Sequence, residues 1–254
     1  MAKSPKKERA DAMLVTHGHA ENTAKAGALI MAGAVYVGER RIEKPGDLLA
    51  PDAAFDIREG AKYVSRGGVK LEGALAAHGV RPAGKSCVDV GASTGGFTDC
   101  LLQHGATRVV AVDVGKGLLA HKLRGDARVV VREETNARFL EPADVGGHAD
   151  LVVVDASFIG LDKLLPAIAR IVRGGGELLA LVKPQFEVDE KEAARNRGVI
   201  RDVVVRGAAI DKCVHEVAAS GFRVVGTSDC VLPGPKGNVE AFVYATRESD
   251  RQEP

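Results

Sequence analysis

The sequence predicts an α/β protein whose larger part is a doubly wound, mostly parallel β-sheet, preceded by a small α+β unit. Short apolar runs alternate with helical segments from Ser86 onward. These runs are apolar throughout, as in strands that helices bury on both faces. Hydrophobic residues make up 45% of the chain and aromatic residues only 4%, so Val, Leu, Ile and Ala must form most of the core.

Residues 1–60 are expected to fold as two short helices followed by small strands. Asn22 or Thr23 can cap the second helix, and turns should follow at Gly38 and at Pro45. The unit is too small to hold much of an active site, so we expect it to bind a partner and not to catalyse a reaction. The elements expected here are helices over 9–18 and 24–31 and a strand over 35–37.

A linker with glycines and charges is expected over 61–68, and the larger domain over 69–254, beginning with a helix over 69–78. The last two strands should pair antiparallel because only a short loop joins them. Seven strands are expected, over 87–90, 109–113, 129–131, 151–155, 178–183, 224–231 and 239–244. The other long helices are expected over 95–104, 161–172 and 202–220.

The bulk composition excludes several classes of protein. Four cysteines lie far apart, which fits neither a zinc site nor a disulfide framework, so no metal is expected and a reducing cytosol is favoured. The basic N-terminus lacks the apolar core of a signal peptide, and no apolar run approaches the ~20 residues that cross a bilayer. A cytoplasmic protein without a membrane segment is therefore expected.

A glycine-rich turn follows the first strand of the larger domain. Ligands of open α/β sheets bind at the carboxyl ends of strands, where glycines let them approach the backbone. The turn reads G-x-x-x-G-G and has no phosphate-loop lysine, so a ligand without phosphate is favoured, although a tight βα turn alone would also explain the glycines. The candidate cofactor residues here are Asp89, Gly91, Ala92, Ser93, Thr94, Gly95, Gly96 and Phe97.

Polar residues at the ends of the following strands indicate the ligand. Asp113, followed by Val114, ends the second strand, where a carboxylate can bind ribose hydroxyls. Asp89 can face the amino group of an amino-acid tail, and Asn136 can lie beside adenine. Asp155 follows the fourth strand. An adenosine that carries an amino acid is S-adenosylmethionine, which is the expected cofactor.

Lys183 ends the fifth strand, where a transferable methyl group should lie. A lysine acts as a base when burial near another cation lowers its pKa, and Lys70 and the cofactor's sulfonium could supply that charge. Asp155 could orient the ammonium groups, and Glu240 could hold Lys70 or the substrate. The stretch D-A-S-F after strand four differs from the N-P-P-Y-like motif of many amine methyltransferases, which favours a hydroxyl acceptor. Four ordinary surface charges are the alternative.

These residues resemble a known family. The order Lys70, Asp155, Lys183, Glu240 resembles the K-D-K-E tetrad of RNA ribose 2′-O-methyltransferases of the FtsJ type. The pattern L-I-x-x-G-x-V-x-V over 29–37, with K-P-G over 44–46, resembles an S4 RNA-binding domain. Nearly the whole chain is similar to the TlyA, or hemolysin A, family. The blocks that carry this similarity are 65–71, 89–98, 135–138, 155–159, 182–187 and 232–240.

The resemblance implies an S4-like domain followed by a class I, Rossmann-like methyltransferase domain with a seven-stranded sheet. It implies S-adenosylmethionine-dependent 2′-O-methylation of a cytidine in ribosomal RNA or ribosomal subunits, with Lys183 as the general base. Family members that modify both subunits usually carry a longer C-terminal helix, so large-subunit RNA is favoured here and small-subunit RNA stays possible. One departure is E-N-T-A-K over 21–25, where the family usually has Ser-Arg and Lys25 would substitute in part.

Local clusters of cations would have to hold the RNA, because phosphate contacts supply most of the affinity and the net charge is only +1. We expect a basic track along the S4-like unit, Arg66 and Lys116, with a solvated charged face as the alternative. Phe158 could stack on the target base or pack in the core. The candidate RNA-binding residues are Lys6, Lys7, Arg9, Lys25, Arg40, Arg41, Arg66 and Lys116.

Two other classes of function compete with this hypothesis. A membrane-active hemolysin should show a long apolar or strongly amphipathic helix, which the sequence lacks. A non-catalytic RNA-binding assembly factor would have no need of Lys183, Asp155 and the glycine turn. A monomer is expected, and naked RNA and assembled subunits are both open as substrates.

Overall fold

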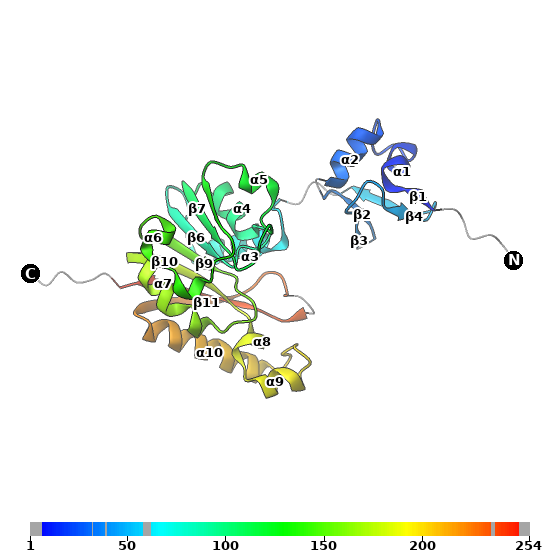
Figure 1. Ribbon diagram of the computed structural model, residues 1–254. Coiled ribbons are helices and arrows are strands. Elements are labelled where there is room, and N and C mark those ends of the chain that lie inside the picture. Colours follow the sequence, from blue (N-terminus) through cyan, green and yellow to red (C-terminus); the bar gives the residue numbers. More distant parts are fainter. Residues whose placement is uncertain (1–6, 32, 39, 58–61, 235–236, 249–254) are drawn as a thin grey trace, which may run out of the picture. The chain divides into compact units, whose positions relative to one another are not determined.

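The computed structural model describes residues 7–31, 33–38, 40–57, 62–234 and 237–248, so Lys6 lies outside the described residues. The chain forms two compact units, residues 1–62 and 63–254 (Figure 1). The predicted linker overlaps this division, and its last three residues already form the first turn of a helix. Within the described ranges, no helix is long and apolar enough to cross a membrane.

The first unit packs two helices against short strands, as the sequence predicts. Asn22 caps the second helix, because its Oδ1 accepts a hydrogen bond of 2.9 Å from the backbone N–H of Lys25. Met13, Leu14 and Ile30 are buried in the core between the helices and strands. Its likeness to an S4 domain stays a prediction. The elements are β1 (Glu8–Arg9), α1 (Ala10–Thr16), α2 (Thr23–Met31), β2 (Val35–Val37), β3 (Arg40–Arg41), β4 (Leu48–Leu49) and β5 (Phe55–Ile57).

The second unit is built on a seven-stranded sheet with the order β11-β12-β10-β9-β6-β7-β8. All strand pairs on the β10-to-β8 side are parallel, whereas β12 runs antiparallel to both β10 and β11. The mostly parallel sheet and its reversed last strand are therefore confirmed. The strands are β6 (Ser86–Val90), β7 (Arg108–Val112), β8 (Val129–Arg132), β9 (Ala149–Val154), β10 (Val172–Val182), β11 (Phe222–Asp229) and β12 (Ala241–Arg247).

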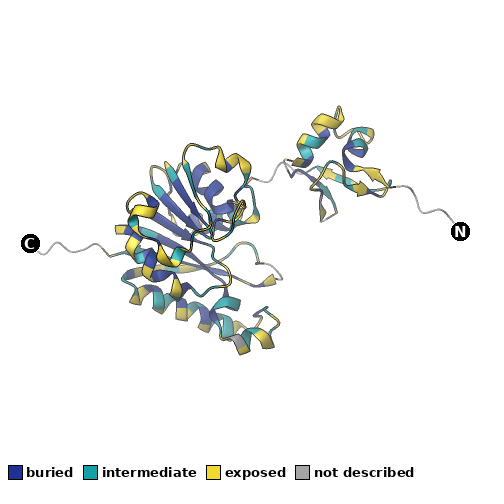
Figure 2. Cartoon of the chain, viewed as in Figure 1, coloured by how far each residue is buried: buried dark blue, intermediate teal, exposed yellow. Residues whose placement is uncertain are grey.

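Helices cover both faces of this sheet, which is why its central strands are apolar at nearly every position (Figures 1 and 2). Val88 and Val90 pack on one side with α7 and α10, while Cys87 packs on the other side with α3 and α4. The helices are α3 (Arg66–His78), α4 (Gly96–Gln103), α5 (His121–Arg124), η1 (Ala137–Phe139), α6 (Pro142–Val145), η2 (Leu161–Lys163), α7 (Leu165–Ile171), α8 (Pro184–Glu187), α9 (Glu190–Arg195) and α10 (Val203–Ala219).

Several predicted element boundaries are wrong, including those of the strands expected over 224–231 and 239–244, which run over 222–229 and 241–247. The helix expected over 161–172 is a short η2 followed by α7, whose first turn contains a proline, and strand β10 begins at Val172. The helix expected from Val69 begins at Arg66. The glycines at its start had predicted a flexible linker. A Cβ on Gly68, however, would lie only 2.2 Å from the Tyr63 ring. Close packing therefore accounts for a glycine inside this helix.

Candidate active site

The turn between β6 and α4 requires its glycines. Gly91 has a φ of +85°, and a Cβ there would lie 2.8 Å from the carbonyl oxygen of Asp155. Gly95 has a φ of +94°, and a Cβ there would meet the side chain of Leu123 at 2.3 Å. Both the left-handed backbone and the close approach exclude larger residues. The turn therefore lies tightly against the end of β9 at the carboxyl edge of the sheet.

Asp113, directly after β7, joins the turn between β6 and α4 to the turn that follows β7. Its Oδ2 accepts a hydrogen bond of 2.8 Å from the backbone N–H of Ser93, and its Oδ1 accepts one of 2.7 Å from that of Gly115. Each carboxylate oxygen has two lone pairs, so both can accept a second hydrogen bond. Asp113 can thus hold the turns and still receive hydroxyl groups of a ligand.

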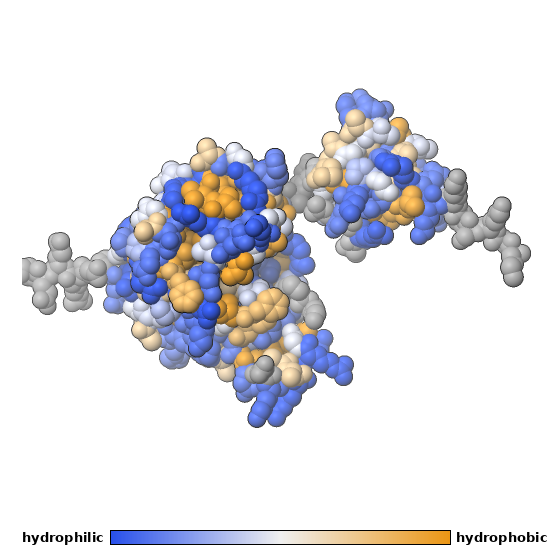
Figure 3. Space-filling view, in the orientation of Figure 1, coloured by the Kyte–Doolittle hydropathy of each residue, from blue (hydrophilic) through white to orange (hydrophobic). Residues whose placement is uncertain are grey.

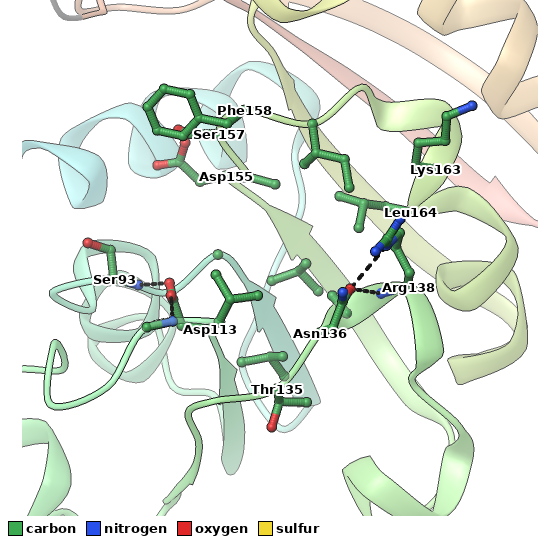
Figure 4. Close-up of a pocket in the computed structure, with 18 of the residues that line it drawn as sticks. Ser93, Asp113, Thr135, Asn136, Arg138, Asp155, Ser157, Phe158, Lys163 and Leu164 are labelled. Carbon is green, nitrogen blue, oxygen red and sulfur yellow. Dashed lines mark hydrogen bonds between the residues drawn. The ribbon is translucent and has the colours of Figure 1, made fainter.

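A cavity of about 800 Å³ opens between these turns and the loops after β8 and β9 (Figure 4). Its size is that of a site for a small organic molecule. The predicted cofactor residues that line it are Gly91, Ser93, Asp113, Val114, Asn136 and Asp155. Sequence reasoning did not assign several further lining residues to a cofactor, among them Gly115, Leu118, Thr135, Arg138, Ser157 and Phe158.

The remaining predicted cofactor residues do not line the cavity. Phe97 is buried, and its ring packs against Phe242 with ring centroids 6.0 Å apart. Gly96 packs under the start of α3, where a Cβ would lie 2.2 Å from Ser65 Oγ. The predicted cofactor residues outside the lining are Asp89, Ala92, Thr94, Gly95, Gly96 and Phe97, of which only Thr94 is exposed.

Asp89 is a fully buried carboxylate near the end of β6. Thr98 Oγ1 donates a hydrogen bond of 2.7 Å to its Oδ2, while its Oδ1 has no hydrogen-bond partner. Burial raises the pKa of Asp89 to about 7, against the opposing hydrogen bond from Thr98. A carboxylate in this state favours a cationic group as its neighbour.

The four predicted catalytic residues form two ion pairs, in which all but the half-buried Asp155 are buried. Lys70 Nζ lies 2.5 Å from Glu240 Oε2, and Lys183 Nζ lies 2.6 Å from Asp155 Oδ1. Val182 pairs with Ala241 across β10 and β12, which brings Lys183 and Glu240 to the same edge. Cys230 lies within electrostatic range of Lys70, Glu240 and Asp155, and burial raises its pKa. The two pairs therefore border a common region beside the cavity.

Lys183 is held by more than its carboxylate. Its Nζ donates to Ser157 Oγ at 2.7 Å and to the carbonyl oxygen of Asp155 at 3.3 Å. Ser157 stands two residues after Asp155 in a stretch that the sequence singled out, but its contact with Lys183 was not predicted. The next residue, Phe158, is 90% exposed. Exposure excludes the core role that the sequence had left open for Phe158.

Glu133, which the sequence did not indicate, shapes one wall of the cavity. Its carboxylate accepts hydrogen bonds from the backbone N–H groups of Gly117 (2.7 Å) and Leu118 (2.8 Å), and it pairs with Arg124. Burial acts to raise the pKa of Glu133, but the backbone N–H groups and Arg124 outweigh it and lower this pKa to about 2. Figure 3 shows an apolar patch close to α5 that hydrophilic side chains surround. Val114 and Leu118, in the preceding turn, are exposed.

The predicted RNA-binding residues that the structure describes are mostly exposed, and several have acidic neighbours. Arg9 pairs with Asp11 and Lys25 with Glu21, each at 2.6 Å, and Lys116 pairs with Glu134 at 3.0 Å. Arg66 donates a hydrogen bond of 2.8 Å to the carbonyl oxygen of Pro233. Lys7 and Arg40 are exposed, and the side chain of Arg41 lies outside the described residues.

Comparisons with known proteins agree with this geometry. The profile of the FtsJ-like methyltransferase family matches residues 63–247. The 16S/23S rRNA (cytidine-2′-O)-methyltransferase TlyA of Mycobacterium tuberculosis is 42% identical over 97% of this chain and 92% of its own. Hemolysin A of Brachyspira hyodysenteriae is 36% identical over 93% of this chain and 98% of its own. A solved structure described as a hemolysin from Streptococcus thermophilus has a TM-score of 0.74 and 37% identity. The match covers 97% of this chain and 92% of that one.

Proposed function

The chain belongs to the FtsJ-like methyltransferase family, and we propose that it methylates the 2′-hydroxyl of a cytidine in ribosomal RNA with S-adenosylmethionine as donor. The observation that carries the proposal is Lys183, which Asp155 and Ser157 hold at the edge of the cavity. The full-length similarity to a relative named as an rRNA (cytidine-2′-O)-methyltransferase supports the choice of substrate.

The residues at the cavity suit an adenosine that carries an amino acid. Asp113 has lone pairs for the two ribose hydroxyls, and Asn136 presents an amide at the far wall, where its Oδ1 already accepts the N–H of Arg138 at 3.1 Å. The buried Oδ1 of Asp89 has no partner, so a ligand that brings positive charge would relieve its cost. S-adenosylmethionine meets these requirements.

When bound, S-adenosylmethionine supplies an activated methyl group. The chain must then place the acceptor hydroxyl and take its proton. Lys183, as a free amine, accepts the proton of the 2′-hydroxyl. The ammonium ion so formed pairs with the Asp155 carboxylate and donates to Ser157 Oγ, and the structure holds both contacts. Glu240 fixes Lys70, whose remaining N–H donors can bind a substrate oxygen.

Phe158 is assigned to the target nucleotide. Its exposed ring stands beside Ser157, with its centroid 5.1 Å from that of Phe186. Sequence-specific RNA recognition commonly stacks an unpaired base on such a ring, and an enzyme that acts on a nucleotide within structured RNA must expose it. We infer that the flipped cytosine stacks on Phe158. Large-subunit RNA is the favoured substrate, and small-subunit RNA is the second one to test.

Substitution of the proposed base tests this function. Lys183→Met should slow methyl transfer by at least about 100-fold, because general base catalysis contributes roughly 10²–10⁴-fold. Ser157→Ala, which keeps the amine but removes one partner, should slow transfer less. Affinity for S-adenosylmethionine, measured by calorimetry, should change little in either variant. Transfer by Lys183→Met at the wild-type rate would contradict the proposal.

A further inference from the structure

The loop between Asp155 and η2, residues 156–160, is held in a strained conformation. Phe158 has a φ of +64°, in the left-handed region that bulky residues rarely adopt. Its side chain is 90% exposed, so packing of the ring in the core does not impose this conformation. Residues held in such regions persist where the surrounding structure fixes them, typically at functional sites. The loop must therefore be fixed at its two ends.

The first end of the loop is fixed to the sheet. The backbone N–H of Asp155 donates a hydrogen bond of 2.9 Å to the carbonyl oxygen of Val90, which continues the pairing of β9 with β6. Ser157 is joined in turn to Lys183 on the other side. These contacts precede Phe158, so a separate contact has to fix the chain after it.

Glu187 fixes the second end of the loop. Its Oε1 accepts a hydrogen bond of 2.9 Å from the backbone N–H of Leu161, and both residues are buried. Glu187 ends the short helix α8, which begins directly after Lys183. The same short helix therefore connects the proposed base to the loop that carries Ser157 and Phe158.

The buried charge of Glu187 is compensated by Lys212 on α10. Lys212 Nζ lies 3.0 Å from Glu187 Oε2 and 3.2 Å from Glu216 Oε1. Burial acts to lower the pKa of Lys212, but the two carboxylates raise it to about 12. Glu187, Cys213 and Glu216 place possible metal-ligand atoms within 4.8 Å of one another. Because the Lys212 ammonium ion already pairs with both carboxylates, we do not assign a metal to this cluster.

We propose that Glu187, compensated by Lys212, is a positioning residue that holds the Ser157–Phe158 loop toward the target nucleotide. The proposal rests on the proposed function for the identity of that nucleotide. Loss of the carboxylate leaves the N–H of Leu161 without its acceptor, and the strained φ of Phe158 relaxes. The phenyl ring and the hydroxyl that orients Lys183 then move, whereas Asp113 and its turns keep their own hydrogen bonds.

Three variants of the full chain test this role. Glu187→Ala should slow single-turnover methyl transfer to ribosomal RNA by about 30- to 100-fold, the scale of a displacement of about 1 Å at a reacting group. Its affinity for S-adenosylmethionine should fall much less than the rate, because Asp113 and its turns keep their own hydrogen bonds although the loop also lines the cavity. Glu187→Gln keeps an oxygen acceptor for Leu161 and should recover most of the rate. Glu216→Gln, which shares Lys212 but does not contact the loop, is the matched control and should transfer normally.

Hydrogen exchange supplies a readout that needs no substrate. The amides of residues 156–161 should exchange faster in Glu187→Ala and at the wild-type rate in Glu216→Gln. Unchanged exchange and rate in Glu187→Ala would overturn the role, as would an equal loss of rate in Glu216→Gln. A loss of cofactor affinity as large as the loss of rate in Glu187→Ala would overturn it too. If Glu187→Ala does not fold, the double variant with Glu187→Gln and Lys212→Met replaces the ion pair by two neutral side chains. Because its glutamine still offers Leu161 an oxygen acceptor, the amides of residues 156–161 must then exchange as slowly as in the wild type. A wild-type protein that methylates no RNA would refute the proposed function, while exchange still tests Glu187.

Discussion

Charged side chains with little exposure gather at the site. Lys70 with Glu240 forms a buried pair at the carboxyl edge of the sheet, and Lys183 with Asp155 forms a largely buried one. Such pairs seldom add stability over apolar residues of the same volume, yet removal of one partner costs about 3–5 kcal/mol. Their presence is therefore better explained by proton transfer and substrate placement than by folding.

Asp89 gives a pH dependence with a defined sign. Its pKa is raised to about 7 in the folded protein from 3.8, so between these values the folded state binds more protons than the unfolded state. Stability should therefore fall as pH rises from about 4 to about 7, by at most about 1.4 kcal/mol per pH unit from this group. Asp89→Asn should remove this contribution.

Urea unfolding of the ligand-free protein at about pH 5 and about pH 8, on either side of the raised pKa, measures that difference. The free energy of unfolding of Asp89→Asn relative to wild type should be larger at the higher pH. Equal differences at the two pH values would show that Asp89 does not titrate in this window.

Residues that act through their side chains at strand ends could be predicted from the sequence. Asp113, Asp155 and Lys183 each follow an apolar run, and parallel strands bring such positions to one edge. The contact of Glu187 with Leu161 could not be predicted in this way, because it joins a side chain to a backbone N–H 26 residues away. A sequence pattern carries no signal for such a bond.

The loops after the strands, and not the strands themselves, form the cavity. The turn from Gly115 to Leu119 stands between β7 and α5, and Glu133 binds its backbone N–H groups from the end of β8. A carboxylate that accepts several N–H groups fixes a turn much as a capping residue fixes a helix. This turn is thus preorganised before a ligand arrives.

Glu133→Ala should free this turn and weaken binding of S-adenosylmethionine by about tenfold, because the ligand must then order the wall of its own site. Glu134→Ala is the matched control, since Glu134 pairs only with the exposed Lys116 among the described contacts of its side chain. Calorimetry on both variants measures the difference. Equal affinity of the two variants would contradict the role of Glu133.

The order and type of the elements followed from the sequence more reliably than their ends. Buried strands between helices predict a parallel sheet, and a short final loop predicts the reversed β12. The start of β10 at Val172 was missed because its glycines interrupt the apolar run and shift its register against β9. Gly67 and Gly68 similarly concealed the start of α3, since their packing against other residues depends on the tertiary structure.

At the scale of the whole molecule, we propose that RNA binding belongs to the first unit and chemistry to the second. The second unit contains the cavity and both of the ion pairs beside it. The first unit carries several of the exposed cations that the sequence assigned to RNA, including Lys7 and Arg40. The net charge of +1 conceals this arrangement, because acidic neighbours offset many of the cations.

Charge reversal in the first unit should weaken RNA binding and leave cofactor binding intact. Lys7→Glu and Arg40→Glu should each lower the affinity for ribosomal RNA, and the slope of log K against log salt should shrink by about 1 for each phosphate that the variant no longer binds. Arg223→Glu, at the opposite end of β11 from the site, is the control. Filter binding at several salt concentrations measures this. RNA affinities that match wild type would exclude the first unit from RNA binding.

Mapping of 2′-O-methyl groups on both ribosomal RNAs, after incubation with S-adenosylmethionine labelled in its methyl group, tests the central claim most directly. Wild-type protein is expected to label the ribose of a specific cytidine, and Lys183→Met to leave that cytidine unlabelled. Label on a base or on protein, or ribose label of wild-type intensity with Lys183→Met, would contradict the account.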